Sequence, residues 1–355
     1  MRPIQARISL GALAHNLRIA RNHAGRARIF AVVKANAYGH GLSRARRALA
    51  SADGFAVLTL EEAANLRLMG VQQPILLLEG LFGADEIATC SELDLWPVLH
   101  HAAQLDWLQR LPPARPIQVF LKFDSGMHRL GFPLEEHASI VKRVRNLPGV
   151  AGVTLMTHFA QADEAVGVDW QLQPFLREMA EHALPWSSAN SAALLRYPEA
   201  QGTWVRPGLM LYGASPFAEV SAEELELRPV MTLQSEIISV QTLKAGEAVG
   251  YGQLYRADHA MRVGVVACGY ADGYPQNAPT GTPIVVNGRL TRTLGRVSMD
   301  MLTVDLDGCA DAGVGAPVVL WGEVLPVDSV AAAARTSSYE LLCALAARVS
   351  VQETD

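Results

Sequence analysis

The 355-residue chain is poor in cysteine, and its cysteines form no pattern typical of a metal or redox site. The four residues, Cys90, Cys268, Cys309 and Cys343, are widely scattered, and no two of them make a CxxC pair. This spacing argues against a zinc site and against a thioredoxin-like motif. Dispersed cysteines without a secretory signature are typical of reduced thiols, so we expect a cytoplasmic protein.

Other features that are missing exclude further classes of protein. No apolar run is long enough to span a bilayer, and the start of the chain lacks the apolar core of a signal peptide. The net charge of −5 argues against a nucleic-acid-binding surface. Hydrophobic residues make up 50% of the chain and charged residues 18%, which indicates a globular protein with a sizeable core. We therefore expect neither a membrane nor a nucleic acid as a partner.

Apolar runs alternate with amphipathic, helix-like stretches over roughly the first 225 residues. This β–α alternation predicts parallel strands joined by right-handed crossovers, and eight such units indicate a (β/α)8 TIM barrel. A doubly wound sheet is the alternative, although no GxGxxG motif follows the first strand. The expected strands are 29–33, 55–58, 75–78, 93–98, 117–121, 153–156, a short segment near 186–188, and 205–212.

The pattern changes near residue 225. Long strand-like runs occupy 230–243 and 261–268, and Asn287-Gly288 between two apolar segments is typical of a hairpin with a type I′ turn. We therefore predict two domains, a barrel over residues 1–225 and a mostly antiparallel β domain over residues 226–355.

The run at 29–33 ends on Lys34, an unusual residue at the end of a buried strand. Burial lowers the pKa of a lysine, and a neutral amine can attack a carbonyl to form a Schiff base. A single lysine in this position more often reaches out to solvent. The neighbouring residues decide between these two interpretations.

The carboxyl ends of the other strands carry further candidates, because TIM barrels place their sites there. Lys122 and His158 end two of the expected strands. A phosphate in a barrel is usually held by the loops after the last strands, where Ser191 and Gly208 offer a hydroxyl and a flexible backbone. Taken singly, these two residues would be an ordinary helix cap and an ordinary turn.

The segment Val33-Lys34-Ala-Asn-Ala-Tyr38-Gly-His-Gly41 resembles the pyridoxal-phosphate attachment motif of the alanine racemases. Similar segments follow in the order of that family and cover nearly the whole chain. They lie at 121–131, 156–159, 189–191, 205–213, 249–255, 269–273, 295–301 and 337–339.

The resemblance implies a cofactor, pyridoxal 5′-phosphate, and a role for each matching residue. Lys34 would bind the cofactor covalently and act as one catalytic base, with Tyr251 as the other. Arg206 would face the pyridine nitrogen with His158 near it, and Arg129 and Met299 would contact the substrate. The residues implied to hold the phosphate are Tyr38, Ser191, Gly208, Leu209 and Tyr339.

These implied roles are chemically consistent with one another. Inverting a stereocentre without rotating the substrate requires an acid/base group on each face, which Lys34 and Tyr251 would provide. Arg206 only donates hydrogen bonds, so it would disfavour a protonated pyridine nitrogen.

Lys122 matches a lysine that is carbamylated in many family members and that pairs with the arginine matching Arg129. A plain lysine, satisfied by Asp124 or by water, is the alternative.

The resemblance thus predicts an isomerase that interconverts L- and D-alanine as a homodimer with shared active sites. Its role in making D-alanine for peptidoglycan or in degrading alanine stays open.

Other interpretations are a decarboxylase or a racemase for another amino acid, a single-barrel cofactor-binding protein, and a cofactor-free aldolase using Lys34. Arg206 argues against the decarboxylase and the second domain against the single barrel. We expect no metal, since His158 with Asp163 and Glu164 is a weak ligand pattern.

Overall fold

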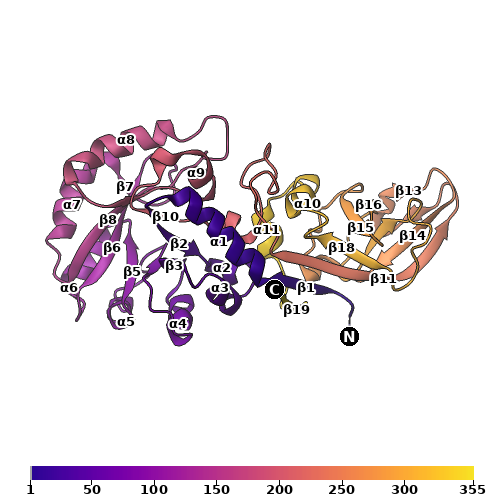
Figure 1. Cartoon of the computed structure of the whole chain (residues 1–355), viewed down its shortest axis with the longest axis horizontal. Helices are drawn as coiled ribbons and strands as arrows, with labels where there is room; N and C mark the ends of the chain where they lie inside the picture. Colours follow the sequence, from indigo (N-terminus) through magenta and orange to yellow (C-terminus); the bar gives the residue numbers. More distant parts are fainter. Residues whose placement is uncertain (1) are drawn as a thin grey trace.

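The computed structural model describes residues 2–355, which form two lobes (Figure 1). One lobe is a helix-covered parallel sheet built mainly from the first part of the chain. The other is an elongated β lobe built from the second part. The C-terminus lies near the junction of the two lobes.

Eight parallel strands make the barrel, and each pairs with its neighbour along one continuous path. The backbone N–H of Thr203 donates to the carbonyl oxygen of Trp186 (2.8 Å) and links the two ends of that path. The predicted eight-stranded barrel is therefore confirmed. In sheet order the strands are β10 (Trp204–Val205), β2 (Arg28–Val32), β3 (Gly54–Val57), β4 (Ile75–Leu77), β5 (Leu95–Leu99), β6 (Ile117–Asp124), β8 (Val150–Met156) and β9 (Trp186–Ser187).

Helices cover the outside of the barrel, and a short strand, β7 (Phe132–Pro133), adds to β6. Ser9 begins the first helix by accepting a hydrogen bond from the Ala12 N–H (3.0 Å), which satisfies an otherwise unpaired donor. The helices are α1 (Leu10–Ala24), α3 (Leu42–Ala48), α4 (Leu60–Leu68), α5 (Glu86–Glu92), α6 (Ala102–Arg110), α7 (His137–Arg145), α8 (Asp169–Met179) and α9 (Ser191–Arg196), with short 3-10 turns η1 (Leu134–Glu136), η2 (Ala180–His182), η3 (Pro198–Ala200) and η4 (Leu209–Tyr212).

Aromatic side chains fill part of the barrel interior. The Phe30 ring stacks on Trp204 with centroids 4.1 Å apart, and it meets Phe120 edge-on at 5.7 Å. Gly54 is required beside them, because a Cβ there would lie 2.5 Å from the Phe30 ring. The barrel is thus a packed core rather than a pore, and side chains at its mouth rest on a rigid base.

The second lobe contains one sheet of eight strands, in which every pairing except β1–β19 is antiparallel. Asn287 and Gly288 both have positive φ (48° and 76°), as the predicted hairpin turn requires. The strands in order are β14 (Met261–Val266), β17 (Leu302–Asp305), β16 (Arg289–Leu294), β15 (Pro283–Val286), β18 (Pro317–Trp321), β11 (Met231–Leu243), β1 (Gln5–Ser9) and β19 (Ser350–Thr354).

The smaller elements of this lobe are β12 (Ala248–Val249), η5 (Tyr251–Gln253), β13 (Tyr255–Arg256), η6 (Tyr270–Asp272), α10 (Val327–Ala333) and α11 (Ser338–Cys343). The predicted boundary near residue 225 falls between η4 and β11. The first strand nevertheless pairs in the second sheet, with Ala6 opposite Leu233 and Val351. Because α1 follows β1 directly, the start of the chain ties the two lobes together.

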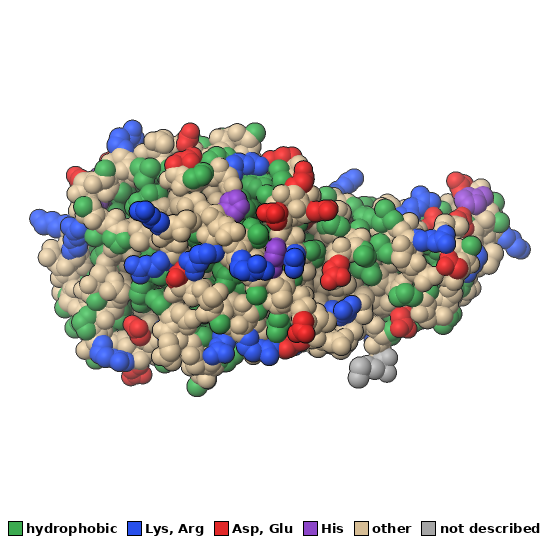
Figure 2. All heavy atoms as spheres, in the orientation of Figure 1, with side chains coloured by type: hydrophobic (Ala, Val, Ile, Leu, Met, Phe, Trp, Pro, Cys, Tyr) green, Lys and Arg blue, Asp and Glu red, His purple; other side chains and the backbone are tan. Residues whose placement is uncertain are grey.

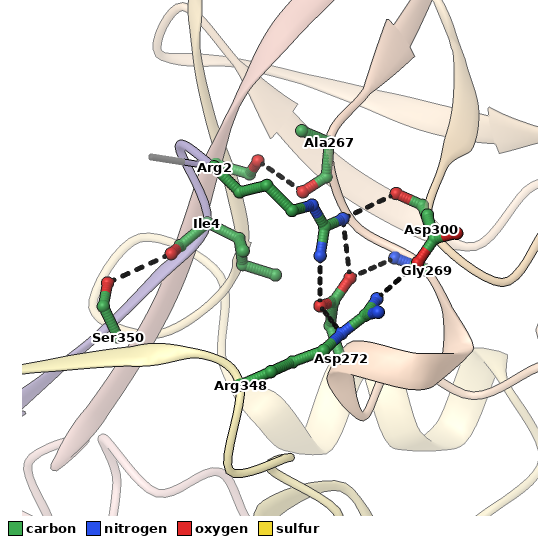
Figure 3. Close-up of polar contacts among 9 residues, drawn as sticks. Arg2, Ile4, Ala267, Gly269, Asp272, Asp300, Arg348 and Ser350 are labelled. Carbon is green, nitrogen blue, oxygen red and sulfur yellow. Dashed lines mark hydrogen bonds and ion pairs between the residues drawn. The ribbon is translucent and has the colours of Figure 1, made fainter.

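A buried carboxylate, Asp272, joins the two ends of the chain to the β lobe (Figure 3). Arg2 donates to it through two nitrogens (2.7 and 3.1 Å), Arg348 donates at 2.7 Å, and the Gly269 N–H donates at 2.9 Å. Arg348 also reaches Asp300 at 2.7 Å. These contacts hold η6 against the loop that contains Asp300.

None of the helices in residues 2–355 is both long and apolar enough to cross a membrane. The face drawn in Figure 2 carries acidic and basic side chains interspersed, with several basic side chains in a row across the barrel lobe. A mixed surface of this kind is typical of a globular protein.

We predict that Asp272→Asn destabilises the protein by roughly 1–3 kcal/mol at pH 7, because two arginines lose their charged acceptor. Burial raises the pKa of Asp272, but hydrogen bonds from Arg2 and Arg348 outweigh it and hold the pKa below its usual range. The carboxylate therefore stabilises the fold above the unfolded pKa of about 3.9, and this contribution is lost as pH falls through the folded pKa.

Denaturant unfolding at neutral and acidic pH measures this effect. The difference in the free energy of unfolding between wild type and Asp272→Asn should become smaller as the pH falls. Asp300→Asn is the matched control, since Asp300 is exposed and should change stability by less than about 0.5 kcal/mol. A difference that does not change with pH would show that the ionised Asp272 carboxylate is not the source of the stabilisation.

Candidate active site

Lys34 lies at the start of a left-handed helical turn, α2 (Lys34–Tyr38). The four residues after Lys34 have φ between 52° and 54°, and none of them is glycine. Such a conformation costs roughly 1–2 kcal/mol per residue for an L-amino acid. Nothing in the sequence predicted this conformation, because alanine and tyrosine give no signal for positive φ. Strain of this kind persists only where the surrounding structure enforces it.

Several contacts enforce the turn. The ring nitrogen Nδ1 of His40 lies 3.0 Å from the Ala37 carbonyl oxygen and 2.8 Å from that of Tyr38. The Tyr212 ring stacks on both Tyr38 and His40, with centroids 4.6 and 4.7 Å away. The Tyr212 hydroxyl donates to the Val32 carbonyl oxygen at 2.8 Å. The turn is thereby fixed to the end of strand β2.

The turn opens into a cavity of about 720 Å³ at the barrel mouth. Most of the predicted site residues line it together: Lys34, Tyr38, Lys122, Arg129, His158, Ser191, Arg206, Gly208, Leu209 and Tyr339. Tyr339 comes from α11 of the second lobe, so both lobes contribute to the cavity within one chain.

Two lysines in the cavity have perturbed pKa values. Burial lowers the pKa of Lys34, and the positive charge of Arg129 lowers it further. Burial also lowers the pKa of Lys122 to about 8, with added repulsion from Arg206 and Arg129. A larger neutral fraction makes each amine a better nucleophile and base than an exposed lysine.

Asp124 does not pair with Lys122. The Asp124 carboxylate accepts from Gly126 and His128, and among residues 2–355 no carboxylate lies within 4.0 Å of the Lys122 amine.

Arg206 is buried and held in one orientation. Its Nη2 donates to the carbonyl oxygens of Thr157 (2.9 Å) and Ser188 (3.1 Å) and lies 3.3 Å from Nδ1 of His158. Its Nη1 donates to the Ser187 hydroxyl. Burial lowers the pKa of Arg206 to about 9. The pKa of His158 is lowered well below its usual range by burial and by Arg206, so the imidazole is neutral.

Ser191 is not the cap of its helix, contrary to the ordinary role considered for it. Asn190 caps α9, because its side chain accepts from the Ala193 N–H at 3.0 Å. The Ser191 hydroxyl instead accepts from the backbone N–H groups of Gly208 (2.9 Å) and Met210 (3.3 Å). Its own hydrogen can therefore be donated into the cavity.

Gly208 leaves room for a ligand at this point. A Cβ on Gly208 would lie 2.6 Å from the Tyr38 hydroxyl oxygen. Leu209 begins η4, so its N–H has no acceptor within that helix. The hydroxyls of Ser191 and Tyr38, the backbone N–H of Leu209 and the open space beside Gly208 make a site suited to an anion such as phosphate.

Tyr251 and Met299 do not join this cavity in the single chain. Tyr251 begins η5 and its side chain is 68% exposed, whereas Met299 is 53% exposed in the loop between β16 and β17. The two loops are neighbours, because a Cβ on Gly295 would lie 3.1 Å from the Val249 carbonyl oxygen. Met301, also exposed, lies on the same loop as Met299, and exposed Tyr270 lies on η6, whose backbone bonds to Ser298 of that loop.

The cavity also contains residues that the sequence analysis missed. Glu79 follows β4, and His100 follows β5 and contacts the Glu79 carbonyl oxygen at 2.9 Å. His101 and Trp107 lie beside them at α6. The same rule that selected Lys122, that strand ends line the site, could have found Glu79 and His100.

A parallel barrel with a strained lysine turn at its mouth, joined to a β domain, defines a class of two-domain barrel proteins suited to amine chemistry. Family models agree with this class. The model for "Alanine racemase, N-terminal domain" matches residues 8–216, and that for "Alanine racemase, C-terminal domain" matches residues 230–352. The chain therefore belongs to the alanine racemase family.

Individual relatives agree along the full length. The alanine racemase of Thiobacillus denitrificans is 74% identical over 353 residues, which cover 99% of this chain and 96% of that protein. That of Nitrosospira multiformis is 54% identical, with 98% of each chain covered. The crystal structure of the biosynthetic alanine racemase from Pseudomonas aeruginosa superposes with a TM-score of 0.98 at 47% identity and complete coverage of both chains.

We predict that Gly39→Ala disrupts the turn far more than its backbone angle explains. Gly39 has φ +80°, and a Cβ there would lie 2.1 Å from the Leu342 carbonyl oxygen of α11, the helix that carries Tyr339. The free energy of unfolding should fall by more than about 2 kcal/mol.

The control is Gly246→Ala, at φ +88°, where the Cβ meets no heavy atom within 4 Å among the described residues. It should lose only about 1 kcal/mol, the cost of positive φ. Equal losses in denaturant unfolding of the two variants would show that the contact with α11 is unimportant.

Proposed function

We propose that this protein is an alanine racemase, an isomerase that interconverts L- and D-alanine with pyridoxal 5′-phosphate held by Lys34. One observation carries the proposal. The family's lysine lies in a cation-lined cavity, on a left-handed turn that several contacts fix. The amine is thus held in place, and its pKa is lowered toward the range where it can attack a carbonyl carbon.

The residues of the cavity fit this cofactor. Lys34 would bind the aldehyde carbon, and Ser191, Leu209 and Tyr38 would donate to the phosphate in the space beside Gly208. When bound, pyridoxal phosphate withdraws electrons from the α-carbon of an attached amino acid and so acidifies the α-proton. Tyr339 would close the phosphate end from α11.

Arg206 would donate to the pyridine nitrogen. Its bonds to Thr157 and Ser188 hold the guanidinium from one side and leave other N–H groups for the ring. A cation in this position keeps a proton off the nitrogen and so moderates electron withdrawal. His158, which is neutral, would lie near Arg206 without adding a second charge. Moderate withdrawal favours simple removal and return of a proton.

Two groups would move the α-proton, one on each face of the substrate. Lys34 would act on one face, and Tyr251 on the other. Arg129 lines the cavity and would bind the alanine carboxylate, with Met299 beside it. Because Tyr251 and Met299 are exposed away from the cavity of their own chain, we propose that a second copy supplies them in a homodimer.

The exposed apolar side chains support this dimer. Tyr251, Leu254, Tyr270, Met299 and Met301 are all exposed on neighbouring loops of the β lobe. Large apolar side chains that gather on a surface mark a contact with another protein. A second copy would bury them and complete two active sites at once.

Lys122 would be carbamylated. Its amine lies among Arg129 and Arg206, and the lowered pKa of about 8 leaves a substantial neutral fraction that can react with carbon dioxide. A carbamate would replace a repelling cation by an anion that attracts Arg129. Arg129 would then be fixed in the orientation that binds a carboxylate.

Chirality-resolved conversion of L-alanine by the purified holoenzyme tests the function, and Tyr251→Phe tests the division between the two bases. By resemblance to the family, Tyr251 should remove the α-proton of L-alanine and Lys34 that of D-alanine. In deuterated water, Tyr251→Phe should still exchange the α-hydrogen of D-alanine. Exchange of L-alanine and racemisation should fall by about 10²–10⁴-fold, the usual effect of losing a general base.

Lys34→Ala is the companion variant and should lose both the absorbance of bound cofactor and racemisation. Mass spectrometry of each enantiomer gives the exchange rates. Absence of racemisation by the wild type would refute the function. Near-normal racemisation by Tyr251→Phe would remove Tyr251 from the mechanism, and equal loss of exchange from both enantiomers would refute the division of faces.

A mixture of Lys34→Ala and Tyr251→Phe chains should recover part of the activity. Each variant alone lacks one base in every site, whereas a mixed dimer contains one site with both. The measurement is racemisation after subunit exchange, with exchange verified by mass-tagged chains. Mixed dimers that stay inactive would show that both bases come from one chain.

A further inference from the structure

Two histidines far apart in the sequence meet on the outer wall of the barrel, outside the cavity. His137 is the first residue of α7, and His182 is the last residue of η2, directly after α8. Nδ1 of His137 lies 2.8 Å from Nε2 of His182. Their side chains are only 13% and 8% exposed. The glutamate before His182, Glu181, completes the group.

The three ligand atoms form a compact triangle. Oε1 of Glu181 lies 3.5 Å from Nδ1 of His137 and 3.7 Å from Nε2 of His182. Ligands about 2.0–2.1 Å from a tetrahedral zinc ion are separated from one another by about 3.3 Å. The three observed distances lie on both sides of that value. A small opening of the two rings would let an ion replace the proton they now share.

A second carboxylate supports the same site from outside. Oε2 of Glu178 lies 3.2 Å from Nε2 of His137, the nitrogen that points away from the triangle. Glu178 therefore favours a proton on Nε2 and a lone pair on Nδ1. Carboxylates that orient a histidine in this way are typical of metal sites. Of the nearby cations, Arg145 is bound to the His182 carbonyl oxygen (2.9 Å) and Arg177 to Glu178 (3.3 Å).

We propose that His137, Glu181 and His182 bind a divalent transition-metal ion, with zinc as the test ion, and so clamp α7 to the end of α8. Two imidazoles and one carboxylate are a donor set that suits zinc, with one tetrahedral position left for water. Hard ions such as magnesium prefer oxygen ligands and should not bind. The site is distinct from the cavity, since none of these residues lines it. No sequence motif marks the site, because 43 or more residues separate His137 from the other ligands.

Calorimetric titration of the reduced, chelator-treated holoenzyme with zinc chloride tests the proposal. One equivalent of zinc per chain should bind and should raise the melting temperature, since a ligand that binds only the folded state stabilises it. Magnesium chloride should do neither. His137→Gln and His182→Gln should each weaken zinc binding by on the order of 100-fold or more, and Glu178→Gln by roughly 10–100-fold.

Glu181→Gln keeps the proposal testable if a histidine variant does not fold. Glu181 is exposed, so this change leaves the fold intact, and zinc affinity should still fall. The matched control is His259→Gln. His259 also contacts two carboxylates, Asp258 and Asp307, but through opposite ring nitrogens that cannot bind one ion. It should leave zinc affinity unchanged.

Three results would overturn the proposal. One is zinc binding no tighter than about 1 mM, which is too weak for three converging ligands. Another is binding that survives both His182→Gln and Glu181→Gln. The third is binding that is lost instead in Cys343→Ser, which would place the ion at the exposed thiol.

Discussion

The left-handed turn after Lys34 is the constraint on which the rest of the site depends. Four consecutive non-glycine residues with positive φ cannot persist in an isolated peptide, because each adds strain. Tyr212 and His40 stabilise the turn from the barrel, and α11 packs against Gly39 from the second lobe. The turn therefore requires both lobes. The lobe that contributes Tyr339 to the cavity therefore also holds the lysine in position.

Positive charge is the second organising feature. Lys34, Lys122, Arg129 and Arg206 all line one cavity. Burial and repulsion by neighbouring cations lower the pKa of both lysines. A larger fraction of each amine is therefore neutral and reactive. The same charges would attract an anionic cofactor and the carboxylate of an amino acid. Arg206 is restrained by hydrogen bonds to Thr157, Ser187 and Ser188, so its charge stays in one place.

Much of the fold could be predicted from the sequence, because parallel strands and a hairpin turn leave local patterns. The run before Lys34 and the Asn287-Gly288 turn are examples. What escaped prediction depends on distant contacts. No local pattern shows that the strand at residues 5–9 pairs with β11 and β19, or that Ala35 adopts positive φ. Ser191 was found, but its bond to Gly208 is visible only in three dimensions.

The placement of Tyr251 gives the two lobes different tasks. The barrel fixes Lys34, Ser191 and Gly208 on a packed core, so these positions tolerate little movement. The β lobe instead presents Tyr251 and Met299 on exposed loops. Asp272 links η6 to Arg2 and Arg348, and backbone bonds join η6 to Ser298 and Met299. The ends of the chain therefore stiffen the loops that a second copy would receive. A rigid presenting surface reduces the entropy lost on association and positions the proposed second base.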